Sequence, residues 1–305
     1  MLQTFDPRNR DLLVNINGVL IHRDRAGISP FDSAVQGGDA VWEGLRLYNG
    51  RVFRLREHLD RLRRSAQALA FSMIPSHESI IAEIKKTFEA NRMYDGVHTR
   101  LTLTRGVKIT SGMDPRLNQF GPTLIVLAEF KPPVYGTKGI RLITASVRRP
   151  SPDVIDPKIH HCNLINSILA KIEANVAGAD DAVMLDNHGF LAETNATHLF
   201  VVEGGVVRTS RPVACPEGIT RAVVLELCRD HGIPHEERDL TQAEAYRADE
   251  CFCTGTMGEL VPVHQLDGRP IGDGQTAGPI TQRLITLFHQ RVAQEGERLI
   301  DSAFD

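Results

Sequence analysis

Hydrophobic and polar positions along the 305-residue chain follow two periods, and each period predicts a different kind of element. Apolar runs flank Asn17-Gly18 and again Asn49-Gly50, and an Asn-Gly pair between such runs is typical of a β-hairpin. Further strand-like runs occupy 98–106, 123–130, 140–147, 181–210 and 249–268. These apolar runs therefore predict strands along the whole chain.

Apolar residues also recur at helical spacing, which predicts helices at 56–71, 76–91, 163–177, 218–232 and 279–294. The segment 163–177 is the most regular of these. Its aliphatic residues Ile165, Ile168, Leu169, Ile172 and Val176 share one stripe, while its charged residues fall elsewhere. Strands and helices are interspersed, so we expect a mixed α and β fold.

The stretch "KPPVYGTKG" is the best candidate for a linker, because it places two prolines and two glycines between strand-like runs. We expect an N-terminal domain at 1–130, a linker at 131–137 and a C-terminal domain at 138–305. This division agrees with the length of the chain, which is enough for two domains of about 150 residues each.

Composition narrows the range of functions. The 35 Lys and Arg residues against 38 Asp and Glu residues give a net charge of −3, so we expect neither nucleic acid nor a membrane as partner. No signal-peptide core and no long apolar run are present, and we expect a cytosolic protein. The five cysteines are irregularly spaced, which argues against a disulfide framework. Cys251-Phe-Cys253 lies in an apolar run and predicts core cysteines, with no metal site.

Two short stretches could bind an anion through backbone amides. Gly218, Ile219 and Thr220 begin a predicted helix, where free N–H groups and the helix dipole favour a phosphate. The second stretch, Gly255-Thr256-Met257, follows a strand and adds a hydroxyl group. Taken singly, each stretch is better explained as an ordinary helix start or turn.

Two kinds of charged residue are also candidates for a site. Six arginines crowd 51–64, and most of them fit a solvated helix face, although one aimed inward could clamp a phosphate. Glu193 lies among apolar neighbours, where a carboxylate is either paired or functional.

Together these stretches resemble the class IV pyridoxal-phosphate enzymes, the D-amino acid and branched-chain aminotransferase group, and most closely the branched-chain branch. The resemblance spans about residues 12–290 and rests on five ordered motifs: "GISPFDSAVQGGDAVWEGLRLYNG", "FRLREHLDRLRRSA", "NLINSILAKIEANVAGADDAVMLDNHGFLAETNATHLFVV", "PEGITRAVV" and "CFCTGTMGELVPV". It implies a two-domain fold with a pseudo-barrel in the C-terminal domain, pyridoxal 5′-phosphate in the cleft between the domains, and a homodimer. It implies transfer of an amino group between an amino acid and a 2-oxo acid.

The resemblance also implies roles for individual residues. Arg61 would clamp the phosphate, and Glu193 would face the pyridine nitrogen and keep it protonated. The amides of the two anion-binding stretches would complete the phosphate site. The substrate pocket would include Arg46, His98 and Arg100.

One position departs from the family pattern. The family's Schiff-base lysine most often lies three residues before the Asn that is Asn163 here, and that position is His160. The nearest lysine, Lys158, lies five residues before Asn163. The lysine of a transaminase both holds the cofactor as an imine and moves a proton, and a histidine can do only the second.

Three hypotheses remain open from the sequence. In the first, Lys158 is the substitute lysine of a working aminotransferase, on the same side as His160 if 158–160 is extended. In the second, the chain binds the cofactor or another phosphorylated ligand without a covalent bond, and His160 or His161 is an acid or base in different chemistry. In the third, the chain is a ligand-binding relative that catalyses no reaction.

Overall fold

The computed structural model describes residues 3–135 and 138–304, and their contacts divide the chain into two compact units. The first unit comprises the described residues of Leu2–Pro132, Ile159–Asn163 and Val292–Asp305, and the second comprises Pro133–Lys158 and Leu164–Arg291. The boundary at Pro132 falls in the expected linker at 131–137. Residues 136 and 137 of that linker lie outside the described residues.

The expected C-terminal domain at 138–305 needs a correction. Ile159–Asn163 and the described residues from Val292 onward pack with the first unit. Short strand pairings explain this. β16 (Glu297–Arg298) pairs with β4, and Val41 and His161 form an isolated antiparallel bridge. The segment that carries His160 is therefore part of the N-terminal unit.

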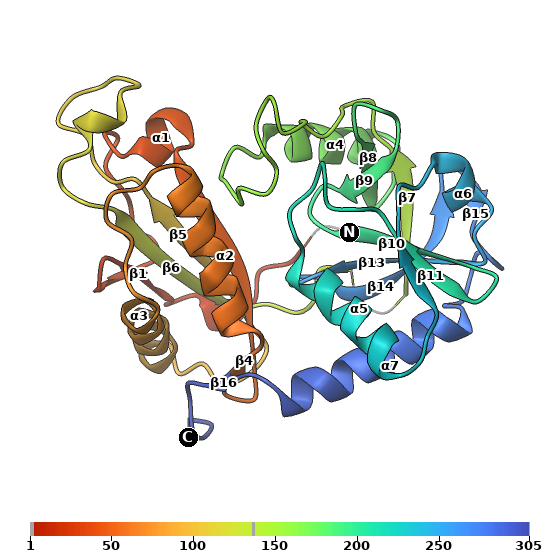
Figure 1. The fold of residues 1–305 in the computed structure, drawn as a ribbon. Coiled ribbons are helices and arrows are strands. Elements are labelled where there is room, and N and C mark those ends of the chain that lie inside the picture. The colour runs from red at the N-terminus through yellow and green to blue at the C-terminus, as the bar shows by residue number, and fades with distance from the viewer. Residues whose placement is uncertain (1–2, 136–137, 305) are drawn as a thin grey trace. The chain divides into compact units, whose positions relative to one another are not determined.

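The first unit is built on a seven-stranded antiparallel sheet in the order β16-β4-β3-β5-β6-β1-β2 (Figure 1). Its other strands are β1 (Leu13–Ile16), β2 (Val19–His22), β3 (Ala40–Tyr48), β4 (Arg51–Val52), β5 (Val97–Thr104) and β6 (Thr123–Phe130). The two Asn-Gly hairpins are confirmed. Asn17 and Gly18 join β1 to β2, Asn49 and Gly50 join β3 to β4, and all four residues have positive φ, as a type I′ turn requires.

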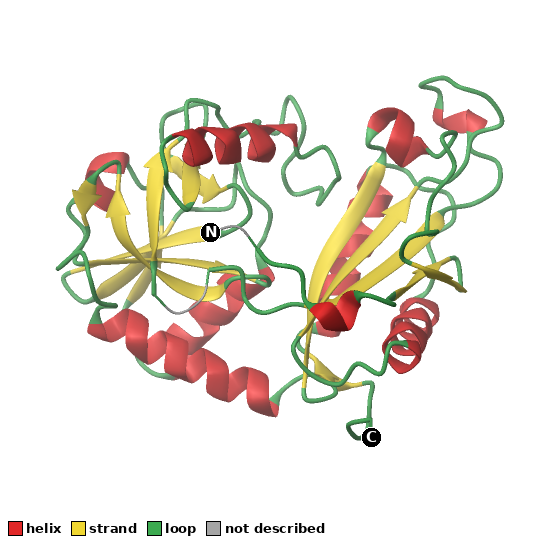
Figure 2. Ribbon diagram, turned by 180° about the vertical axis from the view of Figure 1, so that it is seen from behind, coloured by secondary structure: helices red, strands yellow, loops and turns green. Residues whose placement is uncertain are grey.

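Two long helices of the first unit, α2 (Leu55–Ala68) and α3 (His77–Ala90), share one hydrophobic core with the sheet. Leu59 and Leu62 of α2 and Ile84 of α3 are almost completely buried in it. Ser76 caps α3 by accepting a hydrogen bond from the amide of Ser79. Figure 2 shows this sheet from its other side, with its strands in front of α2. The shorter elements are η1 (Pro7–Asn9), α1 (Ser33–Gly37) and η2 (Pro115–Leu117).

The second unit contains a nine-stranded mixed sheet in the order β12-β11-β10-β13-β14-β7-β8-β9, with β15 paired to β14. Its strands are β7 (Ile140–Thr144), β8 (Asp181–Leu185), β9 (Leu191–Thr194), β10 (His198–Glu203), β11 (Val206–Thr209), β12 (His235–Glu237), β13 (Glu250–Gly255), β14 (Glu259–Leu266) and β15 (Arg269–Pro270). A tight turn from Thr194 to Thr197, closed by a backbone hydrogen bond of 2.7 Å, joins the end strand β9 to β10. The sheet therefore curls.

The helices of the second unit are α4 (Ile165–Val176), α5 (Ile219–Asp230), α6 (Gln242–Tyr246) and α7 (Pro279–Gln294). Cys228 of α5 and the strand cysteines Cys251 and Cys253 are buried and free of disulfides, which confirms core cysteines at 251 and 253. α4 buries Ala170 and Ala174 in a small core with β7 and β8. None of the helices in the described parts of the chain combines the length and the apolar character that crossing a membrane requires.

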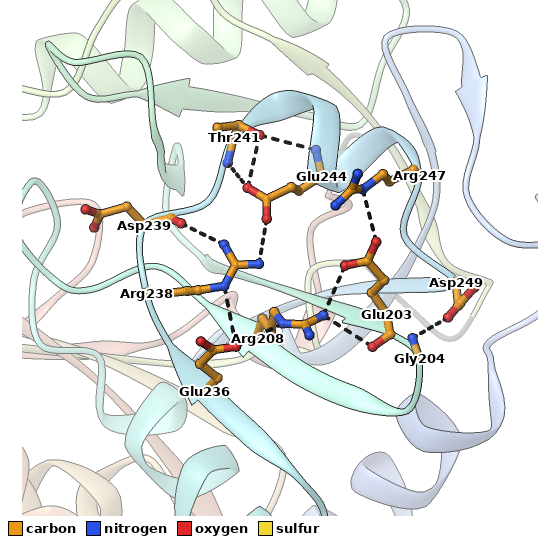
Figure 3. A network of polar contacts seen from close by, with 10 residues as sticks. All are labelled: Glu203, Gly204, Arg208, Glu236, Arg238, Asp239, Thr241, Glu244, Arg247 and Asp249. Carbon is orange, nitrogen blue, oxygen red and sulfur yellow. Dashed lines mark hydrogen bonds and ion pairs between the residues drawn. The ribbon is translucent and has the colours of Figure 1, made fainter.

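Charged side chains join the elements at one edge of this second sheet (Figure 3). Arg208 of β11 donates to Glu203 at 3.1 Å and to Glu236 of β12 at 3.1 Å. Arg238 continues the network to Glu244 of α6 at 2.5 Å. Each exposed pair contributes at most about 1 kcal/mol, but charges along a short edge strand also discourage pairing with another sheet.

Gly50 shows how the C-terminal segment is fixed to the first unit. Its carbonyl accepts hydrogen bonds from the amides of Leu299 and Ile300, at 2.9 and 3.1 Å. A Cβ atom at Gly50 would lie 2.1 Å from the carbonyl oxygen of Ile300. At Gly18 the nearest atom to such a Cβ is a carboxylate oxygen of Glu83, at 3.3 Å, on a side chain that can move.

We therefore expect Gly50→Ala to lower the free energy of unfolding by about 3 kcal/mol and Gly18→Ala by about 1 kcal/mol. Both positions have positive φ, so their difference isolates the collision with the C-terminal segment. Urea unfolding followed by fluorescence of Trp42, the single tryptophan, reports on this unit. Equal losses in the two variants would contradict the assignment.

Candidate functional site

A buried carboxylate organises the polar residues of the first unit. Glu43 of β3 is fully buried, and Arg61 of α2 donates to it twice, from Nε to Oε1 at 2.8 Å and from Nη2 to Oε2 at 2.7 Å. His58 Nδ1 lies 2.6 Å from Oε2, and His160 Nδ1 lies 3.2 Å from Oε1. One carboxylate thus binds a guanidinium and two imidazoles. Of the crowded arginines, Arg61 faces inward, and its phosphate role stays a prediction.

The charges and protons of this cluster follow from its burial. Burial alone would raise the pKa of Glu43, but the charge of Arg61 and the hydrogen bonds from Arg61 and His160 more than offset this and hold that pKa well below its usual range. Burial and the Arg61 charge lower the pKa of His160, so its imidazole is neutral near pH 7. An ionised carboxylate only accepts hydrogen bonds, so we assign the proton of His160 to Nδ1. Nε2 of His160 then carries a lone pair.

The backbone and ring of His160 are fixed as well. Its amide donates to Ser65 Oγ of α2 at 3.0 Å, and its carbonyl accepts from the amide of Trp42 at 3.0 Å. Its ring stacks on Trp42, with centroids 4.3 Å apart and an angle of 27° between the planes. Its side chain is 15% exposed. His160 is therefore a rigid member of the N-terminal sheet edge.

The three predicted substrate residues lie together on one face of the same sheet. Arg46 of β3 is directly opposite His98 of β5, and Arg100 is opposite Gly44. Arg100 also lies over the ring of Trp42, at 3.8 Å from its centroid. Burial and the positive charges of Lys131, Arg46 and Arg100 lower the pKa of His98 to about 3, so this histidine is neutral.

In the second unit, Glu193 is buried at the centre of another polar cluster. Arg149 Nη2 lies 3.0 Å from Glu193 Oε1, so the carboxylate is paired. Arg149 Nε also donates to the carbonyl of Ala214 at 3.1 Å. His198 Nε2 donates to the carbonyl of Pro216 at 2.8 Å and lies 3.9 Å from Glu193 Oε2. Residues 214–216 therefore line the Glu193 cluster.

The first predicted anion-binding stretch approaches His198, and the second directly follows the cross-strand partner of His198. Gly218 is the N-cap of α5, and a Cβ on it would lie 2.4 Å from His198 Cε1, so a larger residue does not fit. Thr254 of β13 is opposite His198 in the strand register, and cross-strand partners share a face. Its buried hydroxyl has no hydrogen-bond partner within the described structure. Gly255 ends β13, and Thr256 and Met257 form the turn to β14.

These features fit the phosphate and ring of a pyridoxal-type cofactor. The helix start at Gly218-Ile219-Thr220 offers N–H groups, and Thr254 offers an unpartnered hydroxyl. Glu193 remains able to accept further hydrogen bonds, since a carboxylate has about four lone-pair sites. The second unit alone thus supplies hydrogen-bond donors suited to a phosphate and one carboxylate acceptor suited to the ring.

Lys158 belongs to the second unit, whereas His160 belongs to the first. The segment around Lys158 is a turn, in which the amide of Lys158 donates to Asp156 Oδ1 at 2.9 Å. The extended conformation considered for 158–160 is therefore wrong. Burial raises the pKa of Cys215, Glu193 raises it further, and the charge of Lys158 is close enough to oppose that rise. Lys158 and Glu193 thus act on the same thiol.

Sequence reasoning missed several residues of these clusters, namely Glu43, His58, Arg149, His198 and Thr254. Glu43 had a usable signal, because a carboxylate inside the apolar run "AVWEGLRL" needs a buried partner. Arg149 had none, since Glu193 and Ala214 are distant in sequence. His198 had none, since nothing in the sequence shows that its ring faces Glu193 and Pro216. Within the described residues, no three His, Cys, Asp or Glu side chains are grouped so that they could bind a metal ion.

Comparison with known proteins places this geometry in a family. Residues 40–266 match the family model described as amino-transferase class IV. The chain is 54% identical over 283 residues to branched-chain-amino-acid aminotransferase-like protein 2 of Arabidopsis thaliana, covering 92% of this chain and 50% of that protein. Branched-chain-amino-acid aminotransferase-like protein 1 of the same plant is covered to 52%, so the chain spans about half the length of these curated relatives.

Other matches extend over whole proteins. D-alanine aminotransferase of Bacillus licheniformis is 30% identical over 94% of this chain and 99% of its own length. The crystal structure of the T.th. branched-chain amino acid aminotransferase complexed with N-(5′-phosphopyridoxyl)-L-glutamate matches with a TM-score of 0.85 and 34% identity, covering 92% of this chain and 93% of that one. The predicted class IV fold is confirmed, and the chain belongs to the class IV aminotransferase family.

Proposed function

We propose that this chain is a pyridoxal 5′-phosphate-dependent aminotransferase of the branched-chain type, in which two residues share the work of the family lysine. Lys158 attaches the cofactor, and His160 transfers the proton. The substrates are an amino acid and a 2-oxo acid. The homodimeric state and the cytosolic location expected from the sequence belong to the same proposal.

The observation that carries the proposal is the position of Lys158, a lysine two residues before His160 that belongs to the same unit as Glu193. The other lysines of this unit are Lys138 and Lys171, and Lys171 already donates to the carbonyl of Asp180. The branched-chain relatives and the phosphopyridoxyl complex of a structural neighbour support the same reaction.

The chain's own residues suit the parts of this cofactor. Amides of Ile219, Thr220 and Met257 and the hydroxyl of Thr256 would bind the phosphate, with Arg61 as counter-ion. Glu193 would accept a hydrogen bond from the protonated ring nitrogen and so stabilise the ring as an electron acceptor. When bound, the cofactor supplies that electron-accepting ring and the aldehyde carbon that receives the amino group. The guanidinium groups of Arg46 and Arg100 suit a substrate carboxylate.

His160 has the properties of a proton-transfer group. It is neutral, Glu43 fixes its Nδ1–H, and Nε2 carries the lone pair, as in the carboxylate–histidine pairs that serve as general bases. Lys158 and His160 are two residues apart, so their Cα atoms lie within about 7 Å of each other whatever the arrangement of the units. Chain connectivity therefore keeps the two residues near each other.

Attachment of the cofactor to Lys158 can be detected directly. We expect borohydride reduction of the protein saturated with pyridoxal 5′-phosphate to leave a stable adduct on Lys158, located by peptide mass spectrometry. Lys158→Ala abolishes the adduct, and Lys138→Ala, an exposed lysine of the same unit, keeps it. An adduct on another lysine, or cofactor binding with no reducible adduct, contradicts the role of Lys158 and favours the non-covalent alternative.

The assignment of attachment to Lys158 and of proton transfer to His160 gives a second prediction. His160→Gln should retain the adduct on Lys158 and lower kcat about 100-fold or more, since a general base contributes roughly that factor. The measurement is steady-state transamination of a branched-chain amino acid with a 2-oxo acid. An unchanged kcat in His160→Gln would mean that another residue transfers the proton.

The Glu43 cluster predicts a large effect on stability. Glu43→Gln leaves the Arg61 charge buried without its counter-ion, so we expect the free energy of unfolding at pH 7 to fall by about 3 kcal/mol. Because the folded pKa of Glu43 is depressed, this contribution is present above the carboxyl's unfolded pKa and disappears as the pH falls toward its folded pKa.

The matched control is Glu57→Gln. Glu57 pairs with Arg54 at 3.1 Å and its side chain is 48% exposed, so its loss should cost less than about 1 kcal/mol. Urea unfolding at pH 7 and at low pH compares the two variants. Similar losses in both, or a Glu43→Gln effect that persists in acid, would contradict the buried ionised cluster.

A further inference from the structure

The linker expected at 131–137 contains a tyrosine whose side chain is held inside the second unit. Tyr135 packs against a hydrophobic core that includes side chains of β7, β13 and β14, and its hydroxyl donates to Oδ2 of Asp181 at 2.6 Å. Asp181 begins β8 and is fully buried, and its Oδ1 accepts from the amide of Ala182 at 2.8 Å. Burial and the Asp181 carboxylate raise the pKa of Tyr135, so its hydroxyl remains a donor. A linker side chain thus has a fixed polar partner in the interior.

The same tyrosine contacts the second of the predicted anion-binding stretches. Its ring lies so close to Gly258 that a Cβ atom there would be 3.0 Å from Tyr135 Cδ2. One residue earlier in the linker, the amide of Val134 donates to the carbonyl of Met257 at 3.1 Å. The turn 255–258, which joins β13 to β14, is therefore held by two consecutive residues of the linker.

A series of buried hydroxyl groups gives this turn a second support. Asp181 also accepts a hydrogen bond from the side chain of Thr194, whose Oγ1 lies 2.6 Å from Thr197 Oγ1. The methyl group of Thr197 lies against the turn, since a Cβ atom on Gly255 would be 3.0 Å from Thr197 Cγ2. Both threonines are buried. Asp181 therefore connects the hydroxyl of Tyr135 to both supports of the turn.

We propose that Tyr135 is a positioning residue for the cofactor phosphate, because its ring and hydroxyl hold the turn 255–258 where Thr256 and Met257 can donate to that phosphate. The inference rests on the proposed function, which assigns those two residues to the phosphate. Glycine at both ends gives the turn more conformational freedom than other residues would, so its neighbours must fix it. Hydrogen bonds weaken steeply as their angle departs from linearity, so a turn that moves binds phosphate less well.

A second tyrosine of the same unit provides a matched control. Tyr246 packs against the same hydrophobic core, and its hydroxyl donates to Oδ2 of Asp267 at 2.7 Å. Asp267 follows the last residue of β14, whereas the turn 255–258 precedes the first residue of that strand. Removing either hydroxyl takes a tyrosine–carboxylate hydrogen bond from the same unit, but only the bond of Tyr135 supports the turn.

Equilibrium dialysis of the cofactor-free chain against two ligands tests the proposal. We expect Tyr135→Phe to raise the Kd of pyridoxal 5′-phosphate about 10-fold, and that of pyridoxal, which lacks the phosphate, less than about 2-fold. Tyr246→Phe should change either Kd by less than about 2-fold, and circular dichroism checks that each variant is folded. An unchanged Kd of pyridoxal 5′-phosphate in Tyr135→Phe overturns the proposal. Equal losses for the two ligands, or in the two variants, overturn it as well.

Hydrogen exchange followed by mass spectrometry gives a readout that needs no ligand. Peptides that cover 255–258 should exchange faster in Tyr135→Phe than in the wild-type chain, and at the wild-type rate in Tyr246→Phe. Gly258→Ala crowds the ring of Tyr135 and leaves its hydroxyl in place, so it should also speed this exchange, and it serves if Tyr135→Phe does not fold. Unchanged exchange at 255–258 in the folded variants overturns the proposal.

The outcomes separate this inference from the proposed function. A wild-type chain that does not bind pyridoxal 5′-phosphate overturns both. A missing adduct on Lys158 overturns only the proposed attachment, because neither dialysis nor hydrogen exchange depends on the covalent bond. An adduct on Lys158 together with an unchanged Kd in Tyr135→Phe overturns only the role of Tyr135.

Discussion

The fold of the N-terminal unit depends on the burial of one ionised carboxylate. Glu43 lies in the middle of a strand with no exposure to solvent, and a carboxylate in that position is stable only if its charge and lone pairs are satisfied. Arg61 supplies the charge, and His58 and His160 supply further donors. This requirement joins β3, α2 and a segment that is distant in sequence.

The same requirement determines what His160 can do. An amine at His160 would add a second cation beside Arg61 on one carboxylate, whereas the neutral imidazole adds a donor without adding charge. His160 is therefore well matched to Glu43 and unable to hold a cofactor covalently. Lys158, the nearest lysine in the sequence, belongs to the second unit. In the proposed function, attachment and proton transfer therefore fall to separate residues.

Local features of the fold were predictable from the sequence, and long-range partners were not. The hairpins at Asn17 and Asn49 follow from turn chemistry that two residues determine. The aliphatic stripe of α4 was also visible, but its exposure to solvent was not, because periodicity defines a face of a helix without saying what covers it. Arg149 and His198 gave no signal, since each acquires its role only when separate strands and loops meet around Glu193.

The protonation state of His160 is the most direct test of how this site works. Long-range ¹H–¹⁵N correlation spectra of histidine-labelled protein near pH 7, assigned with His160→Gln, distinguish the two neutral tautomers and the imidazolium. The structure predicts a neutral ring with its proton on Nδ1 and a lone pair on Nε2. A proton on Nε2, or a positively charged ring, would contradict the account, because Nε2 of His160 would then have no lone pair with which to accept a proton.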